Sequence, residues 1–120
     1  VPPIDCYPGK LNQVFMNILL NALQAIAHDG DIHIKTWSDA AYVYISIRDS
    51  GKGIPADIQS RIFEPFFTTK EIGQGTGLGL SVSYGIIEQH KGNIRVKSKV
   101  NEGTEFIVSI PLNLAQKMKA

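Results

Sequence analysis

Hydrophobic and polar positions alternate in four segments of the chain and recur at helical spacing in two others. The alternation predicts four β-strands, at residues 31–37, 42–48, 93–99 and 104–111. The helical spacing predicts one helix over residues 10–28, which Asp29-Gly30 ends, and a second over residues 79–91, which Gly92 ends. Short turns join both strand pairs, so each pair is expected to form an antiparallel hairpin.

Smaller elements complete this pattern. Residues 4–6 predict a short strand, and Pro55 is suited to begin a short helix that runs to about Phe63. Residues 64–76 show no periodicity, and a loop of this length is often a functional lid. The predicted fold is an α/β (α+β) two-layer sandwich, with helices covering one face of a mixed, largely antiparallel sheet. We expect one domain over residues 1–111 and a weakly helical or frayed tail over 112–120.

Composition narrows the classes of function. The chain has 120 residues, of which 43% are hydrophobic and 19% charged, as in an ordinary single domain. A net charge of +1 argues against a general nucleic-acid binder, and the single cysteine excludes an internal disulfide. Residues 11–28 carry no charge, but five polar side chains interrupt them, so we do not expect a membrane span there.

Those five polar side chains share one side of the predicted helix 10–28. At 100° per residue they fall within a sector of about 80°, and they are Gln13, Asn17, Asn21, Gln24 and His28. A solvent-facing side usually carries Lys and Glu, and this one carries neither. This side of the helix is either an unusual solvent-exposed face or the wall of a half-buried cleft. In a cleft, each amide group needs hydrogen-bond partners. A carboxamide oxygen is also a ligand suited to Mg²⁺.

Two glycine-rich segments are further candidates. Asp49-Ser-Gly-Lys-Gly53 follows an apolar strand and is either a simple tight turn or a place where a ligand amine reaches the carboxylate. Gly73-Gln-Gly-Thr-Gly-Leu-Gly79-Leu80 leads into a helix, whose N-terminus favours phosphate. It fits neither the P-loop nor the dinucleotide fingerprint. A flexible hinge is the alternative interpretation.

The segment between them, Ile62–Lys70, carries three of the five phenylalanines. Phe63, Phe66 and Phe67 could anchor a lid by packing, and Lys70 could reach a terminal phosphate. The alternative is a satellite apolar cluster beside a solvated lysine.

Together and in this order, these segments resemble the catalytic and ATP-binding domain of bacterial sensor histidine kinases, in the GHKL superfamily shared with type II topoisomerases, heat-shock chaperones and mismatch-repair ATPases. The resemblance runs from about Ile4 to Pro111. It equates Gln13–Ala25 with the N box and Asp49–Gly53 with the first glycine box. Phe63–Lys70 corresponds to the F box, and Gly75–Leu80 with Gly103-Thr104 to the remaining glycine motifs.

The resemblance implies roles for individual residues. Asn21 would coordinate Mg²⁺, with Asn17 and Gln13 beside it, Asp49 would accept a hydrogen bond from the adenine amino group, and Thr104 would order the adenine pocket. Asn17 and Lys70 are the implied catalytic residues. The other implied nucleotide-binding residues are Gly51, Gly53, Ile54, Phe67, Gly75, Thr76, Gly77, Leu78, Gly79 and Leu80.

The chain departs from the family pattern at several points. Many members carry a Lys and an aromatic residue where this chain has Gln24 and Ala25, which makes Lys70 the substitute cation. Hydrolytic relatives carry Glu at the position of Asn17, and an amide cannot take a proton from water, so we expect weak hydrolysis. A strand, helix and strand that usually precede Ile4 are absent, so the sheet is expected to be incomplete, with an edge or core that needs a partner.

The implied function is transfer of the ATP γ-phosphoryl group to a histidine on a separate dimerisation domain of the same protein, because His28, His33 and His90 do not lie in an acceptor setting. ATP and Mg²⁺ are the implied cofactors, and a response regulator is the downstream partner. Neither nucleic acid nor membrane is an expected partner. The expected location is cytoplasmic, with an inner-membrane anchor on the parent protein left open. A protein serine kinase and an ATP-gated conformational ATPase are the alternatives.

Overall fold

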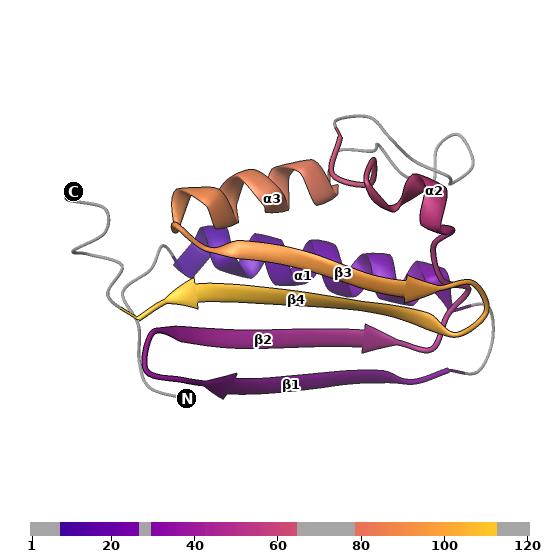
Figure 1. Ribbon diagram of the computed structural model, residues 1–120, viewed down its shortest axis with the longest axis horizontal. Coiled ribbons are helices and arrows are strands. Elements are labelled where there is room, and N and C mark those ends of the chain that lie inside the picture. Colours follow the sequence, from indigo (N-terminus) through magenta and orange to yellow (C-terminus); the bar gives the residue numbers. More distant parts are fainter. Residues whose placement is uncertain (1–7, 27–29, 65–78, 113–120) are drawn as a thin grey trace.

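The structure, a computed structural model, describes residues 8–26, 30–64 and 79–112, and these form two layers (Figure 1). The strand expected at residues 4–6, most of the expected loop 64–76 and the tail beyond Leu112 lie outside the described residues. Within the described part, helices cover one face of an antiparallel sheet, which confirms the predicted fold class.

The sheet has four described strands in the order β1-β2-β4-β3, and every described pairing is antiparallel. The strands are β1 Ile32–Ser38, β2 Tyr42–Asp49, β3 Asn93–Lys99 and β4 Gly103–Pro111. All four predicted strands are therefore confirmed to within about two residues at each end. The register places Asp49, the last residue of β2, between Ile32 of β1 and Thr104 of β4.

Two main helices and one short helix form the other layer: α1 Pro8–Ala25, α2 Ala56–Gln59 and α3 Gly79–Gln89. The helix expected to begin at residue 10 begins at Pro8, since proline is tolerated in the first turn, where no N–H partner is needed. Pro55 precedes α2 instead of opening it, and α2 is shorter than the predicted helix 55–63.

α3 ends at Gln89, two residues before the predicted end at residue 91. Lys91 adopts the left-handed conformation after the helix, with φ 58°. The N–H of Gly92 bonds to the carbonyl of Ile87, and a Cβ on Gly92 would meet the carbonyl oxygen of Ser109 at 2.2 Å. Glycine is needed at position 92 because β4 passes so close to it.

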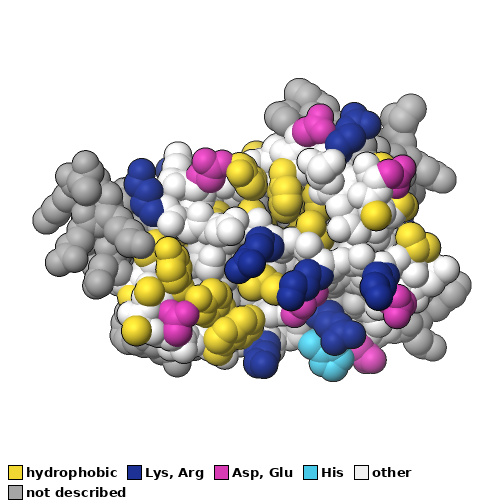
Figure 2. Space-filling view, viewed as in Figure 1, with side chains coloured by type: hydrophobic (Ala, Val, Ile, Leu, Met, Phe, Trp, Pro, Cys, Tyr) yellow, Lys and Arg dark blue, Asp and Glu magenta, His cyan; other side chains and the backbone are white. Residues whose placement is uncertain are grey.

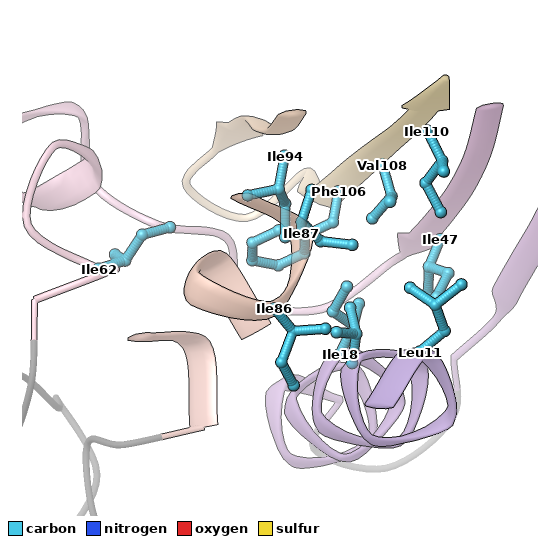
Figure 3. Close-up of a cluster of buried hydrophobic side chains, with 11 residues drawn as sticks. Leu11, Ile18, Ile47, Ile62, Ile86, Ile87, Ile94, Phe106, Val108 and Ile110 are labelled. Carbon is cyan, nitrogen blue, oxygen red and sulfur yellow. The ribbon is translucent and has the colours of Figure 1, made fainter. Parts of the chain in front are cut away.

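The hydrophobic core lies between the two layers (Figure 3). Ile18 from α1 and Ile87 from α3 are fully buried against Phe106 and Val108 of β4, which face the helices at alternate positions. Phe63 joins this core by ring contacts with Tyr84 and Phe106, at centroid distances of 5.4 and 6.4 Å.

Large apolar side chains remain exposed on α1 and on the helix-facing side of β1. Met16, Leu20 and Leu23 of α1 are 48–58% exposed, and Ile34 of β1 is 59% exposed. These exposed side chains mark the surface where the incomplete sheet and core would contact a partner. That contact stays a prediction. Among the described residues, no helix is both long and apolar enough to cross a membrane.

Candidate nucleotide-binding site

A buried carboxylate stands at the end of β2. Asp49 is only 3% exposed, and its Oδ1 accepts a hydrogen bond of 2.8 Å from the N–H of Gly51. Burial raises the pKa of Asp49, while hydrogen bonds from the backbone of Gly51 and Thr104 oppose that shift. A carboxylate has about four acceptor sites, so it can receive a further donor from a ligand.

The turn after Asp49 is held by close backbone packing. A Cβ on Gly51 would lie 2.6 Å from the carbonyl oxygen of Ala25, the last residue of α1, and the N–H of Lys52 bonds to that same oxygen. Gly53 has φ +74°, and a Cβ there would lie 2.0 Å from the carbonyl oxygen of Lys99. The two glycines let the turn dock between α1 and the β3–β4 hairpin.

Ser98 organises the same end of the site, and the sequence did not identify it. Its hydroxyl lies 2.7 Å from Thr104 Oγ1, accepts from the N–H of Ile54 at 2.7 Å and donates to the carbonyl of Gly103. Gln59 donates to the carbonyls of Ile54 and Ser98. The one available signal was a serine following Ile94 and Val96 at a core-facing position of an alternating strand.

The amide side of α1 faces the beginning of α3. Asn17 Nδ2 donates to the carbonyl of Gly79 at 3.1 Å and to Ser83 Oγ at 3.2 Å, and Ser83 Oγ donates to the same carbonyl at 2.8 Å. Ser83 is fully buried and was not predicted from the sequence. This arrangement fixes the last residue of the glycine run, Gly79, against α1.

Asn21 lies between the two ends of the site. Asn17, Asn21 and Ala25 follow one another at four-residue intervals on one side of α1, where Asn17 contacts Gly79 and Ala25 contacts Gly51. The axial rise between Asn17 and Ala25 is ~12 Å, so Asn21 lies about midway. Half-buried Asn21 is therefore placed between the glycine run and the glycine turn.

The remaining predicted residues differ in their surroundings. Gln13 is exposed, and Ile54 and Leu80 pack against the core. Six predicted site residues lie outside the described residues: Phe67, Lys70, Gly75, Thr76, Gly77 and Leu78.

Comparison with known proteins identifies the family of the chain. Residues 6–114 match the family described as histidine kinase-, DNA gyrase B-, and HSP90-like ATPase. The chain is 46% identical over 117 residues to the sensor histidine kinase ZraS of Escherichia coli strain K12, which covers 98% of this chain and 25% of ZraS. It is 47% identical over 113 residues to sporulation kinase E of Bacillus subtilis strain 168, covering 93% of this chain and 15% of that kinase. It thus spans a quarter or less of the length of these relatives.

Solved structures show the same fold. The catalytic domain of histidine kinase ThkA, in a nucleotide-free form, matches with a TM-score of 0.83 and 38% identity, over 94% of this chain and 73% of that one. Full-length ShkA in complex with AMPPNP matches with a TM-score of 0.83 and 28% identity, over 92% of this chain and 23% of that one. The chain therefore belongs to the histidine kinase-, DNA gyrase B- and HSP90-like ATPase family and is a histidine kinase ATP-binding domain within it.

Proposed function

We propose that this domain binds ATP with Mg²⁺ along the amide side of α1 and transfers the γ-phosphoryl group to a histidine on a dimerisation domain of the same protein. The observation that carries the proposal is the position of Asn21, between the glycine turn at Gly51 and the first turn of α3 at Gly79. One extended ligand on this side of α1 would meet both glycine segments.

The glycine-turn end supports binding of the adenine. Asp49 is a buried acceptor, and burial in low dielectric strengthens a hydrogen bond from an exocyclic amine. Thr104 is directly opposite Asp49 in the sheet, and Ser98 holds its hydroxyl. We therefore assign Asp49 as the acceptor for the adenine amino group, with Thr104, Gly51, Gly53 and Ile54 shaping the pocket.

The α3 end supports binding of the phosphates. The first turn of α3 begins at Gly79, where backbone N–H groups have no partner within the helix. The donor set also fits Mg²⁺, because Asn21 offers a carboxamide oxygen and phosphate oxygens would complete the shell. When bound, Mg²⁺ supplies charge neutralisation at the phosphates. Lys70 and the glycines from Gly75 onward remain proposed phosphate ligands.

The chemistry of Asn17 favours transfer to a protein over hydrolysis. Its amide group acts as a hydrogen-bond donor toward Gly79 and Ser83, and an amide is not a general base for water. Asn17 would position the end of the glycine run and would not remove a proton. Positioning and charge neutralisation are the main contributions that phosphoryl transfer needs.

The phosphate acceptor is proposed to lie outside this chain. His90 is fully buried, with its Nδ1 2.8 Å from the carbonyl of Ile86, so a phosphoryl group would not reach it. His33 lies in β1, on the sheet face opposite the helices. The proposed partners are the dimerisation domain of the same protein and a response regulator, in the cytoplasm and without nucleic acid or direct membrane contact.

Calorimetric titration with a non-hydrolysable ATP analogue tests the proposal. The unmodified chain should bind in the presence of Mg²⁺ and much more weakly in EDTA. Asn21→Ala should lose most of this Mg²⁺ dependence. Asn12→Ala provides the matched control, because Asn12 is an exposed asparagine on another side of the same helix. Equal Mg²⁺-dependent binding by both variants would refute the assignment of Asn21.

A further inference from the structure

Lysine and arginine side chains gather on the face of the sheet that the helices do not cover (Figure 2). The strand registers place Arg48 of β2, Lys35 of β1 and Arg95, Lys97 and Lys99 of β3 on it. These are five of the twelve Lys and Arg residues in a chain whose net charge is only +1. We call this surface the basic sheet face.

Carboxylates of the described residues offset only part of this charge. Among the described residues the recorded ion pair joins Arg61 and Glu64, away from this face. Glu105 lies on the face between Arg48 and Lys97, with Ser46 donating to its Oε2, and it offsets one of the five charges; Asp39 accepts from the Tyr44 hydroxyl near the β1–β2 turn. All five cations are exposed. The basic sheet face therefore offers several charges that an anionic partner could meet.

An aromatic cluster adjoins the cations at the end of the face near the β1–β2 turn. The rings of Trp37 and Tyr44 stack with centroids 5.3 Å apart and planes 14° apart, and Tyr42 lies 6.2 Å from Tyr44. Lys35 Nζ is 5.3 Å from the centre of the Trp37 ring. The solvated side of an antiparallel sheet is usually polar, so three half-buried aromatic rings beside exposed cations are typical of a binding surface.

We propose that the basic sheet face binds an acidic segment of polypeptide. Arg95, Lys97 and Lys99 alternate along β3, so their Cα atoms are ~6.8 Å apart at each step. Carboxylates at alternate positions of an extended chain have the same spacing. An apolar side chain at one end of that segment would contact Trp37 and Tyr44.

Other anionic partners fit this surface less well. Single-stranded nucleic acid needs open ring faces for its bases, whereas Trp37 and Tyr44 stack on each other and Lys35 covers Trp37. A membrane surface needs protruding apolar side chains that enter the lipid. Here the aromatic rings are half-buried, and the exposed positions carry cations.

Trp37 is the sole tryptophan of the chain and reports directly on this face. The probe is a short peptide that alternates Glu and Thr and ends in Leu, titrated into the full chain while tryptophan fluorescence is recorded. The comparison peptide carries Gln in place of every Glu. We expect the Glu peptide to change the fluorescence saturably, with an affinity that falls as salt is added, and the Gln peptide to bind far more weakly.

A charge-reversed pair locates the binding. Arg95→Glu with Lys97→Glu should lower the affinity of the chain for the Glu peptide by about tenfold or more at low salt. The matched control, Lys10→Glu with Arg61→Glu, makes the same change in net charge on the helix side and should bind as the unmodified chain does. Circular dichroism checks that both variants are folded.

Several results would overturn the proposal. One is absence of saturable binding of the Glu peptide, and another is an equal loss of binding in the two charge-reversed variants. Tighter binding of oligothymidylate, or of phosphatidylserine vesicles, would assign the face to nucleic acid or to membrane instead. None of these outcomes depends on nucleotide binding, because no residue of the basic sheet face belongs to the proposed nucleotide site.

Discussion

The two ends of the proposed site are built in different ways. At the end near Asp49, the backbone itself is packed tightly, with positive φ at Gly53 and Gly103 and a hydroxyl network around Ser98. At the end near α3, the polar connection is made by the side chain of Asn17, which donates from α1 to the carbonyl of Gly79 and to the hydroxyl of Ser83. We call these the base end and the phosphate end.

This difference indicates how each end responds to a ligand. The base end is part of the sheet and its hairpin, so it should be formed before the ligand arrives. At the phosphate end, α1 and α3 pack through apolar side chains of the core, and the polar contacts of Asn17 add on the order of 1 kcal/mol each. Changes at the base end should therefore affect the fold and binding together, and changes at the phosphate end should be milder.

The largest effect is expected from Gly53→Ala. The new Cβ would lie 2.0 Å from the carbonyl oxygen of Lys99, at a φ of +74° that L-residues rarely adopt. We expect the free energy of unfolding to fall by roughly 2–4 kcal/mol, with loss of nucleotide binding. Urea unfolding measures the loss of stability.

Gly85→Ala is the matched control for this prediction. Gly85 lies within α3, and no atom of the described residues outside the helix's own backbone lies within 4 Å of an added Cβ. Because alanine favours the helix, this change should stabilise the chain by about 0.5–1 kcal/mol. Equal effects of the two substitutions would contradict the close packing at the base end.

Asp49→Asn should produce the next largest effect. It removes the charge from the acceptor proposed for adenine, and a hydrogen bond to a charged group contributes about 1.5–3 kcal/mol, so affinity for the ATP analogue should fall about 10- to 100-fold. Asp31→Asn is the control, because the side chain of Asp31 is exposed. Unchanged affinity in Asp49→Asn would show that the adenine lies elsewhere.

The same substitution gives a pH signature. Burial raises the pKa of Asp49 above its ordinary value of 3.8, so the folded state holds this proton more tightly than the unfolded state. Stability from this group is therefore lost as pH rises from about 3.8 through the folded pKa. Over that range, the unfolding free energy of Asp49→Asn should rise relative to that of the unmodified chain. If it falls instead, the pKa of Asp49 is lowered in the folded state.

Ser98→Ala tests the hydroxyl network at the base end. It leaves the N–H of Ile54 and the hydroxyl of Thr104 without their shared partner, which should cost about 1–2 kcal/mol of stability and weaken nucleotide binding. Ser60→Ala is the control, since Ser60 is exposed after α2. If both variants unfold at the same urea concentration, the network contributes nothing to stability.

Ser83→Ala should have the smallest effect. Asn17 keeps its bond to the carbonyl of Gly79, and alanine favours the helix, so the loss of stability should be about 1 kcal/mol or less. Nucleotide affinity should fall only severalfold, and Ser83→Thr should restore it by returning the hydroxyl. A loss as large as that of Asp49→Asn would mean that the two ends do not differ as described.

The sequence predicted the elements better than the contacts between them. Strand 93–99 was predicted to the residue, because alternation over a half-buried sheet is a strong signal. Gly53 was predicted to lie in a tight turn or beside a ligand, but the neighbour that requires glycine there, the carbonyl of Lys99, is set by the hairpin. Ser83 and Ser98 could not be assigned roles, because a serine shows its function only when its distant partners are known.

The central claim is that one nucleotide occupies both ends of the site. A nuclear magnetic resonance titration with the Mg²⁺ complex of a non-hydrolysable ATP analogue tests it directly through the amide signals of Gly51, Thr104, Asn21 and Gly79. We predict that the signals of both ends shift together and give one dissociation constant. Shifts confined to one end, or two ends that saturate at different concentrations, would contradict a single shared site.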